Sequence, residues 1–167
     1  MRRASAVRVV ASDVTRRGAV ASAPMAEAPA DLTFGKLDLD NEDRFQSLRR
    51  ELGVSSFGIN LITLQPRERG RIHAHERQEE VYLVIEGQLT LVVEGWEHTL
   101  GRGELVRVAP PVRRQLVNKG AQRLALLALG GSGEHVGRDG RAWASWDEGG
   151  PGRPPQEVPS AEDLPAG

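Results

Sequence analysis

The sequence predicts an all-β protein built on one antiparallel sandwich or barrel. From Ser55 to Gly131, short apolar runs recur at intervals of about 8–12 residues, and Gly, Pro or Asn separates them. No helical pattern of about 10–15 residues lies between these runs, so a parallel sheet with crossover helices is not expected. Aromatic residues make up only 4% of the chain, so we expect Val, Leu, Ile and Ala to fill the core.

One short amphipathic helix is expected ahead of the strands, over residues 39–52. Phe45, Leu48 and Leu52 follow the i, i+3, i+7 spacing of one helix face, and Gly53 is typical of the end of a helix. We therefore expect this short N-terminal helix to pack on the outside of the strands.

Seven segments are expected to form strands. The region 79–100 contains two apolar runs that are split at Gly87, and a second turn follows at Glu94–Gly95. We interpret this region as a hairpin that leads into a meander. The expected strands lie, in chain order, within residues 55–66, 79–86, 88–93, 96–100, 103–111, 113–120 and 122–131.

Two of the apolar runs, VYLVI at 81–85 and LALLAL at 124–129, lack the alternation of a strand that is buried on one face. They are expected either to be buried on both faces or to lie against a second copy of the protein. A homodimer is therefore predicted.

Composition excludes several classes of function. The net charge of −1 provides no field to attract nucleic acid or an anionic membrane, and no run of about 18 apolar residues could span a bilayer. We therefore expect a cytoplasmic protein whose partner is a small molecule, with neither nucleic acid nor membrane as a partner. The chain has no cysteine, so any metal must be held by nitrogen and oxygen atoms.

The two ends of the chain differ from its middle. Residues 1–30 are expected to be a disordered or mis-assigned N-terminal extension. Residues 1–24 are similar in composition to a transit peptide, and the alternatives for them are a disordered extension or a true start at Met25. Residues 149–167 hold five of the ten prolines and are expected to form a flexible tail. The predicted domain is therefore 31–148.

His73 and His75 are the strongest candidates for a chemical site. At positions i and i+2 of a strand they would project from the same face, about 6–7 Å apart. Glu80 follows a polar turn over residues 76–79, so a second strand could bring its carboxylate beside the imidazoles. Two histidines and one carboxylate form a known ligand set for ions such as Fe(II), Mn(II), Ni(II), Co(II) or Zn(II).

A plainer interpretation places both histidines on a solvated strand edge. Glu80, however, leads directly into an apolar strand and shares a face with Tyr82 and Val84. A carboxylate at the head of an inward-facing set needs a partner, because burying it unpaired is costly. The other two histidines, His98 and His135, are expected on the surface and in a glycine-rich loop.

The spacing His73-x-His75, four residues, Glu80, six residues, Gly87 resembles the first motif of the cupins, a family of small jelly-roll β-barrels. The resemblance covers roughly residues 55–130. It implies a single cupin barrel in which the two histidines and Glu80 hold a divalent transition metal such as Zn, Fe, Mn or Ni.

The second cupin motif is less complete in this chain. The family usually supplies a fourth ligand, a histidine, from this motif, and Arg114 fills that position between Gly103 and Asn118. Arginine is permanently charged and does not ligate a metal. Three arrangements stay open: a metal on three protein ligands, a guanidinium that pairs with Glu80 in place of the metal, or an anion that Arg114 holds beside a metal.

The resemblance implies a fold more than an activity, since cupins include isomerases, dioxygenases, decarboxylases, storage proteins and sugar sensors. The main expectation is a metal-binding cupin with a small polar or anionic ligand, which Arg114, Tyr82 and Gln115 contact. An enzyme of this kind would carry out isomerase- or dioxygenase-type chemistry. The alternatives are a metal-free module that binds a carboxylate or phosphate through Arg114, and a non-catalytic regulatory or structural dimer.

Overall fold

The computed structural model of the chain describes residues 32–40, 42–131 and 139–165. The strands lie in one compact unit, Thr33–Gly167. The predicted N-terminal extension over residues 1–30 lies outside the described residues, and so does His135. No helix in the described part of the chain is long and apolar enough to cross a membrane.

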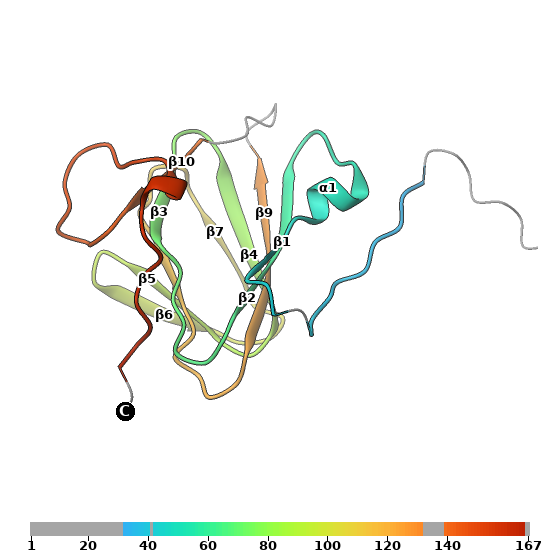
Figure 1. The fold of residues 1–167 in the computed structure, drawn as a ribbon, viewed down its shortest axis with the longest axis horizontal. Helices are drawn as coiled ribbons and strands as arrows, with labels where there is room; N and C mark the ends of the chain where they lie inside the picture. The colour runs from blue at the N-terminus through green and yellow to red at the C-terminus, as the bar shows by residue number, and fades with distance from the viewer. Residues whose placement is uncertain (1–31, 41, 132–138, 166–167) are drawn as a thin grey trace, which may run out of the picture. The chain divides into compact units, whose positions relative to one another are not determined.

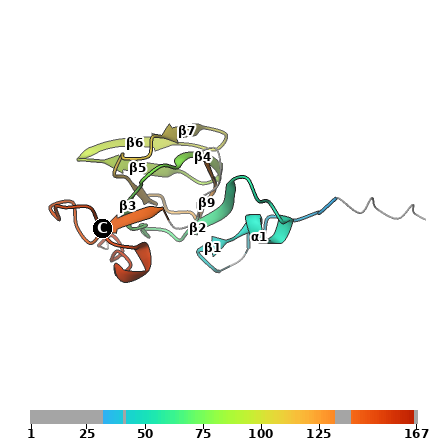
Figure 2. The same cartoon turned by 90° about the horizontal axis from the view of Figure 1, so that it is seen from above.

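Antiparallel sheets make up the described domain (Figures 1 and 2). A five-stranded sheet has the order β1-β2-β9-β4-β7, a three-stranded sheet has the order β6-β5-β8, and β10 pairs with β3. The predicted all-β class of jelly-roll type is confirmed, although the strands do not close into a continuous barrel. The strands are β1 (Phe45–Gln46), β2 (Gly58–Leu64), β3 (Ile72–His75), β4 (Glu79–Glu86), β5 (Leu89–Val93), β6 (Trp96–Leu100), β7 (Leu105–Val108), β8 (Gln115–Val117), β9 (Leu124–Gly131) and β10 (Gly140–Trp143).

The main core lies between the inner faces of the two larger sheets. Tyr82 and Val84 of β4 and Leu124 and Leu126 of β9 belong to one buried cluster with Leu89 of β5. Each of the five side chains is at most 1% exposed. Burying a valine or leucine side chain of this kind contributes about 1.5–3 kcal/mol to the free energy of unfolding. The candidate site is built directly on this core, because Tyr82 belongs to both.

The outer face of β2 and β9 is covered by the chain itself. Leu48 of the short helix α1 (Leu48–Leu52) packs with Leu61 of β2 and Ala125 of β9, and Leu127 adds to this second cluster. This packing explains why LALLAL does not alternate: its outward-facing side chains are also covered. Burial on both faces, one of the two predicted alternatives, therefore accounts for β9. The homodimer stays a prediction.

The predicted helix over residues 39–52 is shorter in the structure. α1 begins at Leu48, and Phe45 and Gln46 form β1 at the edge of β2 instead. Phe45 is 55% exposed and does not belong to a buried helix face. Pairing with β2 satisfies backbone N–H and C=O groups, and this outweighs the weak tendency of a short isolated segment to form a helix. The predicted end at Gly53 is confirmed by its left-handed conformation, with φ of 70°.

The predicted hairpin between the runs at 79–86 and 88–93 is wrong. β4 pairs with β7 and β9, whereas β5 pairs with β6 and β8. The turn at Gly87 carries the chain from one sheet to the other, because β4 and β5 pack their apolar side chains across the same core. The second predicted turn is confirmed: Glu94 and Gly95, with φ of 47° and 83°, join β5 to β6 as a two-residue hairpin turn.

Residues 149–165 contact the domain, and the flexible tail over residues 149–167 stays a prediction. Val158 is buried, and the backbone of Arg153 pairs with Ala142 of β10. Hydrogen bonds from guanidinium groups to main-chain carbonyls also join this segment to the domain. The donors are Arg71 Nε to Val158 O (2.7 Å), Arg69 Nε to Glu162 O, and Arg67 Nε to Leu164 O (3.2 Å).

Replacing Gly87 with alanine should destabilise the domain by about 3 kcal/mol, because two costs add. The φ angle of Gly87 is +76°, and an added Cβ would lie 2.4 Å from the carbonyl oxygen of Arg123. Gly95→Ala is the matched control: its φ is +83°, but nothing lies within 4 Å of the added Cβ. That variant should lose only about 1–2 kcal/mol. Urea unfolding measures both losses, and equal losses would contradict the steric part of this prediction.

Candidate metal centre

Strand β3 presents two imidazoles to the interior of the domain. His73 and His75 project from one face, as predicted, while Ile72 and Ala74 on the other face belong to a separate apolar cluster. β10 pairs along one edge of β3. On the other edge, the backbone of His73 exchanges two hydrogen bonds of 2.9 Å with Arg114. Both edges of the strand are therefore fixed, which sets the direction of the two rings.

A carboxylate orients the ring of His75. The Nδ1–H of His75 donates to Oδ1 of Asp139 at 2.8 Å, and Asp139 also accepts from the backbone N–H groups of Arg77 and Gln78 at 3.2 and 2.8 Å. Burial by itself would raise the pKa of Asp139, but these three donors lower it below its usual value. An ionised Asp139 keeps a ring proton of His75 on Nδ1, so Nε2 is the ring nitrogen that faces Glu80.

A backbone carbonyl orients the ring of His73. Its Nδ1 lies 3.1 Å from the carbonyl oxygen of Arg71, which can only accept, so the ring proton belongs on Nδ1. Burial lowers the pKa of His73, and the contact with Glu80 opposes that shift only in part. The ring is therefore neutral near pH 7, and its Nε2 faces the Tyr82 hydroxyl at 3.2 Å.

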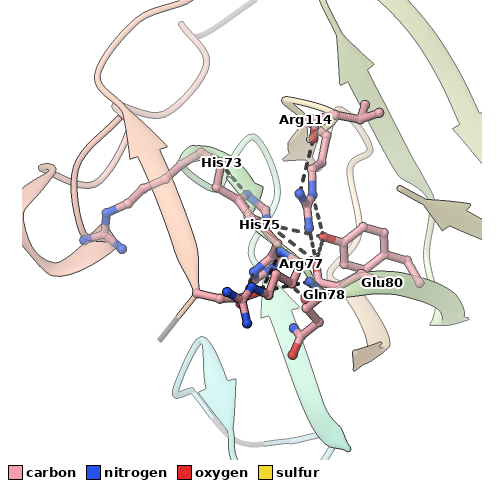
Figure 3. A network of polar contacts seen from close by, with 10 residues as sticks. His73, His75, Arg77, Gln78, Glu80 and Arg114 are labelled. Atoms are coloured by element: carbon pink, nitrogen blue, oxygen red, sulfur yellow. Dashed lines mark hydrogen bonds and ion pairs between the residues drawn. The ribbon is translucent and has the colours of Figure 1, made fainter. Parts of the chain in front are cut away.

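The carboxylate of Glu80 contacts both rings (Figure 3). Its Oε1 is 3.3 Å from Nε2 of His75, and its Oε2 is 3.7 Å from Nε2 of His73. Burial by itself would raise the pKa of Glu80, but the contacts with the two histidines and with Arg114 hold it well below its usual range. The group is an ionised carboxylate that faces Nε2 of both imidazoles.

Arg114 reaches the same carboxylate from the position directly before β8, and its side chain is fully buried. The guanidinium donates to Oε2 of Glu80, to the Tyr82 hydroxyl at 3.1 Å and to the carbonyl oxygen of Val112 at 3.2 Å. Burial by itself would lower the pKa of Arg114, but Tyr82 and Glu80 raise it, so the charge is retained. These contacts leave Oε1 of Glu80 outside the ion pair.

The other two residues predicted to contact a ligand differ in their placement. The Tyr82 hydroxyl donates to Oε2 of Glu80 and lines the pocket in front of the site. Burial and the neighbouring carboxylate raise the pKa of Tyr82 well above its usual value, so the phenol stays neutral. Gln115 points elsewhere: its amide donates to the carbonyl oxygen of Gly70 at 2.9 Å, and it is not among the residues that line this pocket.

The three side chains fit a divalent metal. One ligand atom each from His73, His75 and Glu80 lies within 4.8 Å of the others. Nε2 of His75 is buried and has no hydrogen-bond partner among the described residues. Buried polar atoms are rarely left in this state, and a cation at the centre of the cluster would complete it. Two neutral imidazoles and one carboxylate also have the donor chemistry that first-row divalent ions prefer.

The cluster opens onto a pocket of about 750 Å³, a size that suits a small molecule. Arg114 does not line this pocket, because its guanidinium lies behind Glu80 and Tyr82. The C-terminal segment contributes one wall through the 3-10 helix η1 (Pro155–Glu157). The remaining wall includes Phe45, Asn60, Ile62, Gln78, Asp139, Gly140 and Arg141.

The family model of the cupin domain matches residues 60–130 of the chain. This region of the chain belongs to the cupin superfamily. The matched region contains His73, His75 and Glu80 of the first motif. It also contains Arg114, which stands where the second motif usually has a histidine. Among curated proteins, none matches the chain.

Solved structures agree with this assignment. A cupin-superfamily sugar phosphate isomerase from Silicibacter pomeroyi is 29% identical, with a TM-score of 0.51, and the alignment covers 55% of this chain and 59% of that one. The cupin therefore spans about three-fifths of the length of that protein. A Cupin 2 conserved barrel domain protein from Salinispora arenicola is 23% identical (TM-score 0.52; 59% and 87% covered). A cupin protein from Bacteroides fragilis is 19% identical (TM-score 0.52; 59% and 84% covered), and these last two matches show the fold alone.

Sequence reasoning missed Asp139 and the strand β10 that follows it. The region before Gly140 was interpreted as a glycine-rich loop, and the cupin motifs do not extend to it. The available signal was weak: one acid stands directly before Gly140-Arg141-Ala142-Trp143, a segment of strand length. Only the pairing of β10 with β3 brings this carboxylate to His75 in the cupin domain.

Asp139→Ala should destabilise the metal-free cupin domain by about 2–4 kcal/mol, because three donors lose their acceptor. Asp139→Asn is the matched variant, since its amide oxygen can still accept from His75 Nδ1, and it should lose roughly half as much. Urea unfolding at neutral pH with a chelator present measures both values without any contribution from metal. Equal losses would show that the hydrogen bond to His75 does not contribute to stability.

Proposed function

We propose that this cupin binds a divalent first-row transition metal through Nε2 of His73, Nε2 of His75 and the carboxylate of Glu80. A small polar or anionic molecule would occupy the pocket in front of the metal. The observation that carries the proposal is the state of the three groups: both rings are held by Nδ1, and both Nε2 atoms face one ionised carboxylate. Three ligands from the protein would leave open positions for water or for the bound molecule.

The surroundings of the three ligands support the same function. The bond from Asp139 to His75 Nδ1 is the arrangement that commonly fixes the ring and raises the basicity of a metal-binding histidine. Arg114 and Tyr82 contact Oε2 of Glu80, so Oε1 is the oxygen that remains for a metal. When bound, such an ion would polarise a carbonyl or hydroxyl oxygen of a ligand in the pocket.

The class of the bound molecule is proposed from the pocket and from one relative. The amides of Asn60 and Gln78 and the guanidinium of Arg141 suit a polar or anionic molecule. The Silicibacter pomeroyi relative is described as a sugar phosphate isomerase, so a phosphorylated sugar is one such molecule to test. Isomerase-type chemistry would then follow for this chain.

Purified without a histidine tag from metal-supplemented medium, the protein should carry about one transition-metal ion per chain, measured by elemental analysis. The His73→Ala/His75→Ala double variant should lose nearly all of it, because one carboxylate cannot hold such an ion alone. His98→Ala is the matched control, since His98 is exposed on β6 and stacks on Trp96. Its metal content should equal that of the unaltered protein. Absence of metal from the unaltered protein would overturn the proposal.

A metal-free binding module is the second candidate, and the Arg114–Glu80 ion pair favours it. The guanidinium already balances the charge of Glu80, so the buried carboxylate does not require a cation. Arg114 itself is enclosed behind the pocket, however, so an anion in the pocket would contact Arg141 and Gln78 first. Calorimetric titration of metal-free protein with inorganic phosphate or acetate tests this candidate directly.

Arg114→His should raise the affinity for Zn²⁺ or Co²⁺ by more than about tenfold, since it removes a cation beside the site and adds an imidazole. Arg114→Gln removes the same charge without adding a ligand, so it should raise the affinity by a smaller factor. Competition with a chromophoric chelator measures both. An unchanged affinity in Arg114→His would mean that position 114 cannot reach the metal.

A further inference from the structure

We infer that Arg114 makes this metal centre selective for anionic ligands, so that a small carboxylate or enolate binds in preference to a neutral molecule of similar size. The inference rests on the proposed metal site and adds the chemical class of the ligand that binds at its open positions. It assigns to Arg114 a role that needs no contact with that ligand, which agrees with its full burial behind Glu80.

The charges around the site carry the argument. Histidine binds a metal as a neutral imidazole, so the two rings would add no charge to the centre. Glu80 and Asp139 are the two carboxylates in contact with these rings. Two carboxylates alone would neutralise a divalent ion. The guanidinium of Arg114 leaves one positive charge uncompensated at the centre.

The buried position of the Arg114 charge strengthens its field at the open positions of the metal. Arg114 is 0% exposed and Glu80 is largely buried, so solvent and salt screen their fields only weakly. The other charges of the pocket act less strongly. Arg141 is paired with Glu76, and Glu157 is exposed at the wall, where screening is stronger. The buried guanidinium therefore determines the charge that a bound molecule meets.

An anion at an open metal position would restore neutrality, whereas a neutral molecule would not. The preference should appear as an affinity difference between an anionic and a neutral ligand, and it should change with the charge at position 114. It should also change in the opposite direction when the negative charge of Asp139 is removed, because Asp139 belongs to the same set of charges.

The test uses the full chain loaded with Co²⁺, whose visible absorption reports both metal binding and binding of a further ligand. Azide serves as the anionic probe and imidazole as the neutral probe, both at fixed ionic strength and at a pH of about 8.5, where imidazole is almost entirely unprotonated. Arg114→Gln should weaken azide binding by about tenfold, Arg114→Lys should retain most of it, and Asp139→Asn should strengthen it. Imidazole binding should change by no more than about twofold in all three variants, since the probe carries no charge.

Arg107→Gln is the matched control, because Arg107 is an exposed arginine that pairs with Glu79 outside the pocket. Its azide affinity should equal that of the unaltered protein. If Arg114→Gln lowers the affinities for azide and imidazole equally, the inference is overturned. It is also overturned if Asp139→Asn lowers the azide affinity or leaves it unchanged. A loss in Arg141→Gln with none in Arg114→Gln would assign the selectivity to the pocket wall instead.

The outcomes also separate this inference from the metal site itself. If the unaltered chain binds no Co²⁺, the proposed function fails before any probe is added. If the chain binds Co²⁺ normally and azide responds to neither charge change, the metal site stands and only the role of Arg114 is overturned. If Arg114→Gln does not fold, Asp139→Asn still decides the question, since its predicted change has the opposite sign.

Discussion

The two oxygens of the Glu80 carboxylate are the constraint on which the rest of the site depends. Oε2 accepts from Arg114 and Tyr82, and Oε1 faces Nε2 of His75. A fully buried guanidinium costs several kcal/mol unless its charge and its donors are matched, so Arg114 requires this carboxylate. The carboxylate of Glu80, near the start of β4, thereby contacts the histidines of β3 as well as Arg114. The position of the site therefore follows from where one buried charge can be satisfied.

The backbone holds Arg114 and the two histidines in a defined geometry around Glu80. Arg114 lies opposite His73 through two main-chain hydrogen bonds, and β10 fixes the other edge of β3. The imidazoles cannot rotate freely, because a carbonyl and a carboxylate each accept from an Nδ1–H group. The result is two Nε2 atoms held toward one carboxylate before any ligand arrives, which reduces the cost of ordering them on binding.

Local patterns in the sequence predict much of this arrangement, and long-range pairing explains the rest. The i, i+2 spacing places His73 and His75 on one face, and the two-residue period places Glu80 with Tyr82, because both rules depend only on strand geometry. The β4–β5 connection was misassigned, because the apolar runs that suggest a hairpin also suit two strands in opposite sheets. Asp139 was missed for a related reason: its contact with His75 spans 64 residues and depends on the pairing of β10 with β3.

The replacement of a ligand histidine by arginine need not remove a metal site of this kind. A histidine in the second motif would add a fourth neutral donor, whereas Arg114 adds a positive charge and holds one oxygen of Glu80 in place. The first change would strengthen metal binding through an additional bond. The arginine would weaken metal binding by repulsion. It would also leave more open positions on the metal and a larger unbalanced positive charge for an incoming anion. In the proposed site, the arginine would lower the affinity for the metal and raise the selectivity toward the molecule that the metal would bind.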